Sequence, residues 1–207
     1  MDPINLILTV TVINLVGTMS PGPSFIIVAQ NAINHSRKAG ICTTLGIVLA
    51  DMVHVTYCLL GIAVLISKSI LLFNAIKYLG ALYLIYLGIK SVFSKSEINV
   101  QEEGSTEQLS DYQAFKNGFL VTLLNPKATL LFLGIFTVTI PAGTPTIVMA
   151  ITGAIMLLSI FLWYLFVAVF LTQNTVRSIF LKFKEIFNKA FGSLLVALGV
   201  KVALSQK

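Results

Sequence analysis

The sequence predicts an all-α, polytopic membrane protein of six transmembrane helices, arranged as a 3+3 inverted repeat in which helices 1 and 4 are broken. Of the 207 residues, 57% are hydrophobic and only 11% are charged. A soluble domain of this size needs more charge to cover its surface. Several apolar stretches reach the roughly 20 residues that a helix needs to cross a bilayer, and two of them contain prolines at corresponding positions.

Six apolar segments follow one another along the chain, separated by polar breaks. They cover approximately residues 4–33, 41–66, 70–93, 115–140, 146–171 and 190–204. The first segment is interrupted by Ser20-Pro21-Gly22-Pro23, and the fourth is interrupted by Asn125-Pro126-Lys127. A basic stretch, 177–189, precedes the sixth segment, which is therefore expected to be the shortest helix.

A polar segment divides the chain into two three-helix repeats. Residues 94–113 are rich in Glu, Gln and Ser, which predicts a solvated cytoplasmic linker between a first repeat, 1–93, and a second repeat, 114–207. Because each repeat holds an odd number of helices, the two must insert with opposite orientations. Inverted repeats with broken helices in corresponding positions characterise many transporters.

The distribution of Lys and Arg predicts the orientation in the membrane. One side collects nine of them: Arg37, Lys38, Lys90, Lys95, Lys116, Arg177, Lys182, Lys184 and Lys189. The other side collects Lys68, Lys201 and Lys207. The richer side is expected to be cytoplasmic, which places both termini outside. Because all the basic residues except Lys77 and Lys127 lie at helix ends, and none of them form a basic face, the net charge of +6 does not predict a nucleic-acid partner.

The two proline-containing breaks are the first candidate site. Proline lacks an N–H and clashes with the preceding turn, so it frees backbone carbonyls from the helical hydrogen bonds. In lipid such groups are tolerated only where protein or water satisfies them. The breaks at 20–23 and 125–127 therefore predict a substrate or ion site, with carbonyls facing a cation and half-helix amides facing a carboxylate. A plain kink that only shapes packing is the alternative.

Asp51 and His54 are the second candidate site. Asp51 lies inside the second apolar segment, where a charge costs at least about 2.5–3.5 kcal/mol and needs a partner, a proton or a water-filled cavity. His54, three residues further on, lies on the same helical face. A carboxylate beside an imidazole could carry a proton or bind the ammonium of an amino acid. A structural ion pair or a neutral buried carboxyl is the alternative.

Two lysines are candidate counter-charges. Lys77, in the third segment, could pair with Asp51 or could equally extend its amine to the outer interface. Lys127 lies deeper in its segment and is harder to explain as an anchor. It could meet a substrate carboxylate or pair with Asp51.

The remaining small residues predict packing rather than chemistry. Gly80, Gly88, Gly192 and Gly199 are typical of positions where membrane helices approach closely, and a homodimer through these helices is left open. Cys42 and Cys58 lie sixteen residues apart in one predicted helix, about 24 Å and beyond disulfide reach. They have no metal-ligand spacing, and no metal or cofactor is expected.

The chain resembles the LysE/RhtB family, whose members export amino acids and homoserine lactones. The matching residues are Ser20-Pro21-Gly22-Pro23, the series Gly40, Gly46, Asp51, His54 and Gly61, the run from Lys77 to Gly88, Gly118-Phe119, and Asn125-Pro126-Lys127. The resemblance implies an efflux carrier of the bacterial cytoplasmic membrane that is driven by proton exchange. It also implies that the functional residues include Pro21, Gly22, Pro23, Asp51, Asn125, Pro126 and Lys127. It does not supply the substrate or the stoichiometry.

The sequence is compatible with three functions to different degrees. The leading hypothesis is a secondary exporter of a small zwitterion, such as an amino acid or a derivative, and not an enzyme. The second is a metal-cation exporter, which would need several Asp, Glu or His near the midplane, whereas the sequence offers Asp51 and His54. The third is a thiol–disulfide carrier, which the separation of Cys42 and Cys58 opposes.

Overall fold

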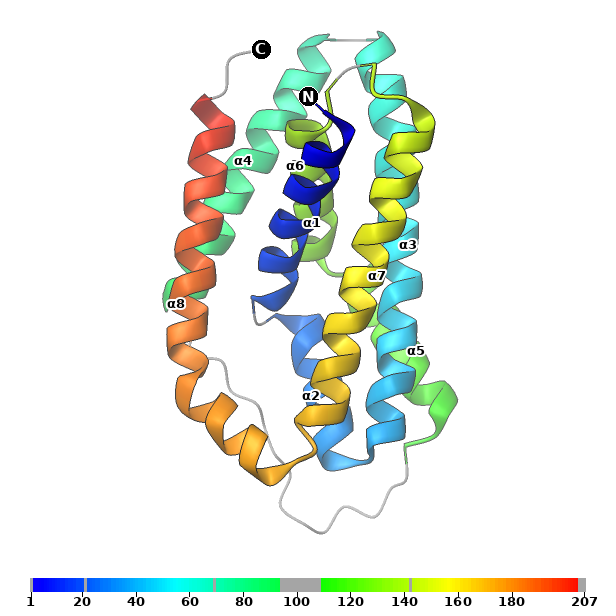
Figure 1. Ribbon diagram of the computed structural model, residues 1–207, viewed down its shortest axis with the longest axis vertical. Coiled ribbons are helices and arrows are strands. Elements are labelled where there is room, and N and C mark those ends of the chain that lie inside the picture. Colours follow the sequence, from blue (N-terminus) through cyan, green and yellow to red (C-terminus); the bar gives the residue numbers. More distant parts are fainter. Residues whose placement is uncertain (1, 21, 69, 94–108, 142, 205–207) are drawn as a thin grey trace.

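The computed structural model describes residues 2–20, 22–68, 70–93, 109–141 and 143–204, and all regular structure in these ranges is α-helical. The helices are α1 (Pro3–Met19), α2 (Pro23–Asn34), α3 (Arg37–Lys68), α4 (Ile70–Phe93), α5 (Asp111–Leu123), α6 (Pro126–Thr139), α7 (Thr146–Phe170) and α8 (Asn174–Leu204). The predicted all-α class is confirmed (Figure 1). The predicted third and fifth segments match α4 and α7 to within one residue.

Two pairs of helices are sharply bent where the sequence predicts broken helices. α1 and α2 meet at an angle of 59°, and the angle between α5 and α6 is 54°. α2 and α6 each begin at a proline, because the first turn of a helix does not use the N–H that proline lacks. By length and composition, the described part of the chain offers two membrane-crossing helices, α3 and α7, or four crossings if each bent pair is one span.

The start of α1 and the end of α8 lie at the same end of the molecule, and the α2–α3 and α7–α8 junctions lie at the opposite end (Figure 1). α4 and α8 pack along one another on one side, whereas α3 packs against α5 and α7 on the other. α1 and α6 lie between these groups. The two breaks therefore fall inside the bundle and not at its ends.

The last helix is longer than the sequence analysis expects. α8 begins at Asn174, so the basic stretch 177–189 is helical and is continuous with the segment from 190. The prediction of a short sixth helix was wrong because it followed hydropathy alone. The stretch contains no Gly or Pro, and Ile179, Phe183 and Ile186 recur at helical spacing, which is typical of an amphipathic continuation of the helix.

α5 begins at Asp111, inside the segment expected to be linker. The Ser110 hydroxyl accepts a hydrogen bond from the Gln113 N–H at 3.2 Å, and the Gln113 side-chain oxygen accepts one from the Ser110 N–H at 3.0 Å. These two bonds form a capping box, which satisfies two donors that a helix start otherwise leaves unpaired. Lys38 Nζ also lies 2.6 Å from Asp111 Oδ2, and this exposed ion pair joins the starts of α3 and α5.

The outer surface of the bundle is apolar. Leu8, Leu60, Leu82 and Leu158, from four different helices, are each more than half exposed. Large exposed apolar areas of this extent are rare in soluble monomers, whereas acyl chains cover them without cost. This surface supports a multi-pass membrane protein.

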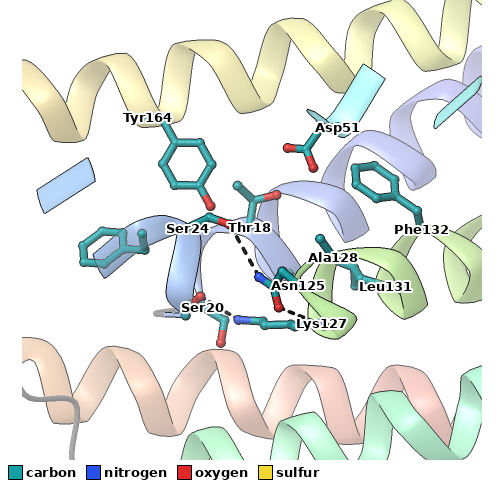
Figure 2. Close-up of a pocket in the computed structure, with 13 residues that line it drawn as sticks. Thr18, Ser20, Ser24, Asp51, Asn125, Lys127, Ala128, Leu131, Phe132 and Tyr164 are labelled. Carbon is teal, nitrogen blue, oxygen red and sulfur yellow. Dashed lines mark hydrogen bonds between the residues drawn. The ribbon is translucent and has the colours of Figure 1, made fainter. Parts of the chain in front are cut away.

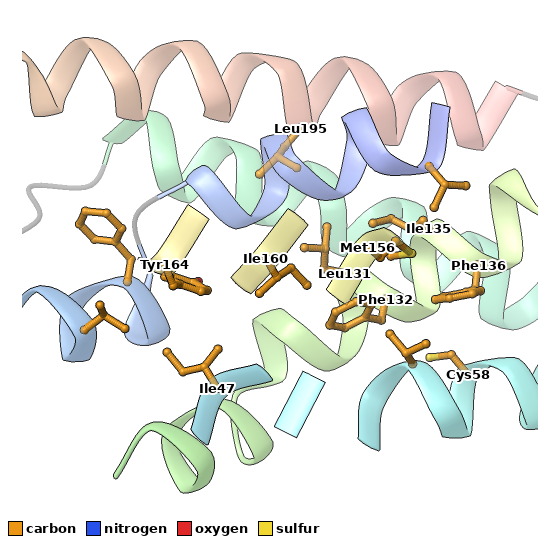
Figure 3. Close-up of a cluster of buried hydrophobic side chains, with 14 of the residues drawn as sticks. Ile47, Cys58, Leu131, Phe132, Ile135, Phe136, Met156, Ile160, Tyr164 and Leu195 are labelled. Atoms are coloured by element: carbon orange, nitrogen blue, oxygen red, sulfur yellow. The ribbon is translucent and has the colours of Figure 1, made fainter. Parts of the chain in front are cut away.

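A buried apolar core fixes α3, α6 and α7 relative to one another (Figure 3). Ile47 of α3, Phe136 of α6 and Ile160 of α7 are each at most 1% exposed. Dense packing of this kind holds the flanking backbone in place. The core lies beside the two breaks, so the polar groups there are held by a rigid surround.

Glycines allow two pairs of helices to approach backbone to backbone. A Cβ added to Gly46 of α3 would lie 2.0 Å from the Phe115 carbonyl oxygen, and one added to Gly118 of α5 would lie 2.2 Å from that of Thr43. Between α4 and α8, a Cβ added to Gly88 would lie 2.5 Å from the Gly192 carbonyl oxygen. A Cβ added to Gly192 would lie 2.6 Å from the Gly88 carbonyl oxygen. Close packing of small residues is thus confirmed between α4 and α8, where the sequence predicts it, and the structure adds the approach of α3 to α5.

Gly199 makes a similar approach to α4: an added Cβ would lie 2.8 Å from the Ala81 carbonyl oxygen. The predicted packing role is therefore confirmed for three of the four glycines. The surroundings of Gly80 lie outside the described residues, and its role stays a prediction.

We expect Gly46→Ala to destabilise the folded protein much more than Gly153→Ala. At Gly46 the new methyl group would overlap a backbone carbonyl, whereas at Gly153 it would meet the ends of the Val55 and Leu59 side chains, at 2.9 and 3.5 Å. Overpacking costs about 1–3 kcal/mol, and only flexible side chains can move away. Thermal unfolding in detergent, followed by size-exclusion chromatography, measures the difference. Equal melting temperatures would contradict the close approach of α3 and α5.

Candidate functional site

The two helix breaks are in direct contact, although they lie about a hundred residues apart in the sequence. Lys127 Nζ, at the start of α6, donates a hydrogen bond to the Ser20 carbonyl oxygen at 2.8 Å. Asn125 Nδ2 donates to Ser24 Oγ at 3.5 Å, and Ser24 Oγ shares a hydrogen bond with Thr122 Oγ1 at 2.9 Å. Figure 2 shows Ser20, Ser24, Asn125 and Lys127 converging from the two broken helices.

The first break is open because of its local conformation. Ser20 and Gly22 are both extended, so the last turn of α1 keeps carbonyls that have no partner within the helix. The Lys127 amine satisfies the Ser20 carbonyl at the negative end of the α1 dipole. A Cβ on Gly22 would lie 3.1 Å from Lys127 Nζ. Glycine at position 22 therefore leaves space for the lysine.

The second break is held by a side-chain cap. Asn125 Oδ1 accepts a hydrogen bond from the Lys127 N–H at 3.0 Å, which is the usual N-cap arrangement for asparagine. Pro126 follows as the first residue of α6. The cap leaves Asn125 Nδ2 pointing to Ser24, so one amide group both starts α6 and contacts α2.

A cavity of about 30 Å³ lies at the junction of the breaks. Its lining comes from α1, α2, α3, α6 and α7 and consists of Gly17, Thr18, Ser20, Gly22, Ser24, Phe25, Asp51, Asn125, Lys127, Ala128, Leu131, Phe132 and Tyr164. This space holds one or two water molecules. A larger solute requires the surrounding helices to move apart.

Asp51 reaches this cavity from α3 and is only 5% exposed. Figure 2 shows its carboxylate and the Lys127 amine on opposite sides of Asn125. Among the described residues no ion pair or hydrogen bond joins Asp51 to another side chain. A buried charge without a partner is costly in a membrane, so the carboxylate needs a proton, water or a cationic ligand.

His54 does not line the cavity. Its Nε2 is 3.1 Å from the Thr122 carbonyl oxygen, its Nδ1 is 2.7 Å from the Tyr57 hydroxyl, and its ring stacks on Phe132 with centroids 5.8 Å apart. Residues three apart on a helix differ by about 60° in direction, which separates His54 from Asp51 here. The histidine links α3 to the end of α5 and supports the wall of the cavity.

The other predicted residues are placed as follows. Pro23, the first residue of α2, is exposed and does not line the cavity. Pro21 lies outside the described residues, and so does the side chain of Lys77 in α4. The pairing of Lys77 with Asp51 therefore stays a prediction. Lys127 contacts Ser20 and not Asp51, which leaves its amine next to the cavity.

Sequence reasoning missed the contribution of α7. Tyr164 lines the cavity and is only 5% exposed, but α7 has no proline or charge that marks a functional position. Thr18 and Ser24 were also missed, although they flank the first break. A polar residue within one turn of a broken helix is the signal that could have found them.

The fold and the site define a helical membrane protein whose two broken helices meet at a small cavity lined by polar and apolar side chains. The chain belongs to the LysE type translocator family, whose model matches residues 15–206, and the predicted resemblance is confirmed. It is 34% identical to the uncharacterized membrane protein YrhP of Bacillus subtilis over 193 residues, which cover 89% of this chain and 92% of YrhP.

Two relatives carry functional names. The chain is 28% identical to the threonine efflux protein of Escherichia coli K12, over 97% of this chain and 98% of that protein. It is 32% identical to the leucine efflux protein of Salmonella typhimurium over 126 residues, which cover 60% of this chain and 58% of that protein. No solved structure matches the chain.

Proposed function

We propose that this protein exports amino acids across the bacterial cytoplasmic membrane. Its family of translocators and its similarity to threonine and leucine efflux proteins support amino-acid efflux. The observation that carries the proposal is the placement of one acidic group, Asp51, and one basic group, Lys127, at a cavity between two broken helices. An amino acid carries one ammonium and one carboxylate, which are complementary in charge to Asp51 and Lys127.

The proposed binding mode pairs each end of the zwitterion with a fixed group. The Asp51 carboxylate receives the substrate ammonium, and the Lys127 amine receives the substrate carboxylate. Leu131 and Phe132 offer an apolar wall to the side chain. Because both protein charges become neutralised together, the bound solute offsets the cost of burying them. The cavity must widen before such a solute enters.

The proposed coupling is an exchange of one proton for the solute. When the solute leaves, Asp51 loses the ammonium that neutralised it, and a carboxylate alone in the membrane interior is unfavourable. A proton entering from outside replaces the ammonium on the carboxylate and is released to the cytoplasm when the next substrate binds. No other acidic group lines the cavity in the described part of the chain.

We further propose six membrane crossings, with each bent pair forming one crossing and both termini outside. The common end of the two termini (Figure 1) and the Lys and Arg count support this topology. Alkaline phosphatase fused after Lys207 should be active, because the proposed topology places it outside the cytoplasm. Green fluorescent protein fused at the same position should not fluoresce, because it would be exported unfolded. The opposite result would reverse the orientation.

Efflux from preloaded proteoliposomes tests the function. Vesicles loaded with labelled threonine, leucine or other amino acids should lose at least one of them several-fold faster with the protein than without it, and an inward proton gradient should accelerate the loss. Unchanged loss across a broad amino-acid panel would remove the proposal.

The metal-cation alternative has less support. No group of three or more His, Cys, Asp or Glu gathers anywhere in the part of the chain that the structure describes, and Asp51 and His54 point to different surroundings. Unchanged metal tolerance of cells that overproduce the protein would agree with amino-acid efflux.

A further inference from the structure

Polar groups extend from the cavity along the contact between α1 and α7. Asn14 of α1 hydrogen-bonds to Met156 and Ser159 of α7. We define the α1–α7 seam as the residues that share a helical face with these: Thr11, Asn14 and Thr18 on α1, and Met156, Ser159 and Trp163 on α7. On each helix the three residues follow the spacing i, i+3, i+7, which places them on one face. Thr18 lines the cavity, as does Tyr164 beside Trp163, so one end of the seam opens at the site.

Hydrogen bonds cross the seam at its middle. Asn14 is completely buried, and its Nδ2 donates to Ser159 Oγ at 3.2 Å and to the Met156 carbonyl oxygen at 3.4 Å. Ser159 Oγ donates to the same carbonyl at 2.7 Å. A buried amide between two membrane helices is costly unless it is fully paired, and here it is only half paired.

Three buried side-chain atoms of the seam have no hydrogen-bond partner within the described part of the chain: Thr11 Oγ1, Asn14 Oδ1 and Trp163 Nε1. Each such atom lowers stability, because it has left water without gaining a partner. Packing alone does not explain a hydroxyl, an acceptor oxygen and a donor N–H that are all unpaired along a single helix contact in an apolar surround. They can bind a hydrogen-bonding solute, or the water that accompanies it, when the helices separate.

We infer that the α1–α7 seam is the hydrophilic path by which the solute leaves the cavity toward the face that carries both termini. The inference rests on the proposed efflux function for its direction. α1 runs from that face to the cavity, and α7 runs beside it in the same sense (Figure 1). Export ends on this face because the basic residues mark the other face as cytoplasmic.

Thiol labelling from outside tests the path without requiring transport. In a chain with Cys42→Ala and Cys58→Ala, single variants Thr11→Cys and Asn14→Cys are compared with Val12→Cys. Val12 lies at the same depth but is 58% exposed on the outer surface of the bundle, where lipid covers it. The probe is a membrane-impermeant, positively charged methanethiosulfonate added to intact cells.

Asn14→Cys and Thr11→Cys should react at least about tenfold faster than Val12→Cys, because only a hydrated thiol ionises to the reactive thiolate. If both react as slowly as Val12→Cys, the seam is not a path. Thr11→Cys keeps the test decisive if Asn14→Cys does not fold. Efflux by the unmodified protein is measured separately in proteoliposomes. Absent amino-acid efflux together with fast labelling would reject the efflux function and leave a hydrated seam, whereas efflux together with slow labelling would reject the seam alone.

Discussion

Asp51→Asn should abolish efflux while the protein still inserts and folds. Asparagine has the same shape and lines the same cavity, but it cannot pair with an ammonium as a charge or carry a proton. Losing a charge-assisted hydrogen bond costs about 1.5–3 kcal/mol, or roughly ten- to hundredfold in binding. Losing the proton site removes coupling altogether. Insertion becomes easier because the buried charge is gone. Proteoliposome efflux at several pH values measures both effects.

Asp111→Asn is the matched control. Asp111 has the same side chain, but it is exposed at the start of α5 and pairs with Lys38. Surface ion pairs contribute about 0–1 kcal/mol, so efflux by this variant should equal that of the unmodified protein. Normal efflux with an unchanged pH profile in Asp51→Asn would exclude Asp51 from both binding and coupling.

The places where the helices break could be predicted from the sequence. Prolines define the starts of α2 and α6 because proline favours the first turn of a helix and disrupts its interior. The same prolines indicated that Ser20, Gly22, Asn125 and Lys127 would matter, and the structure brings all four to one cavity.

The details of the cavity could not be predicted. From the sequence, the partner of Lys127 was expected to be either a substrate carboxylate or Asp51. In the structure its partner is the Ser20 backbone carbonyl. Every residue has a backbone carbonyl, so the sequence cannot indicate which one the lysine contacts. Spacing placed Asp51 and His54 on one face, but a difference of about 60° was enough to turn His54 toward Thr122. Tyr164 lies on a helix without any break, so only the packing of α7 reveals it.

Lys127→Met should reduce amino-acid efflux by at least about tenfold, which corresponds to the loss of a charge-assisted hydrogen bond to the substrate carboxylate. Methionine keeps an apolar stem of similar length and removes the amine. The exposed Lys116 of α5 provides the control, because Lys116→Met makes the same chemical change outside the cavity and should leave efflux intact.

The Lys127 amine also bridges the two breaks through Ser20, so a loss of efflux alone does not separate carboxylate binding from simple support of the fold. The two roles can be separated by comparing efflux of an amino acid with efflux of the corresponding amine, which lacks the carboxyl group. If Lys127 holds the carboxylate, the unmodified protein prefers the amino acid and Lys127→Met removes that preference, since only one of the two solutes has a group for the lysine. If both solutes lose efflux equally, Lys127 acts as a bridge between the broken helices, and the carboxylate must bind to the helix N-termini instead.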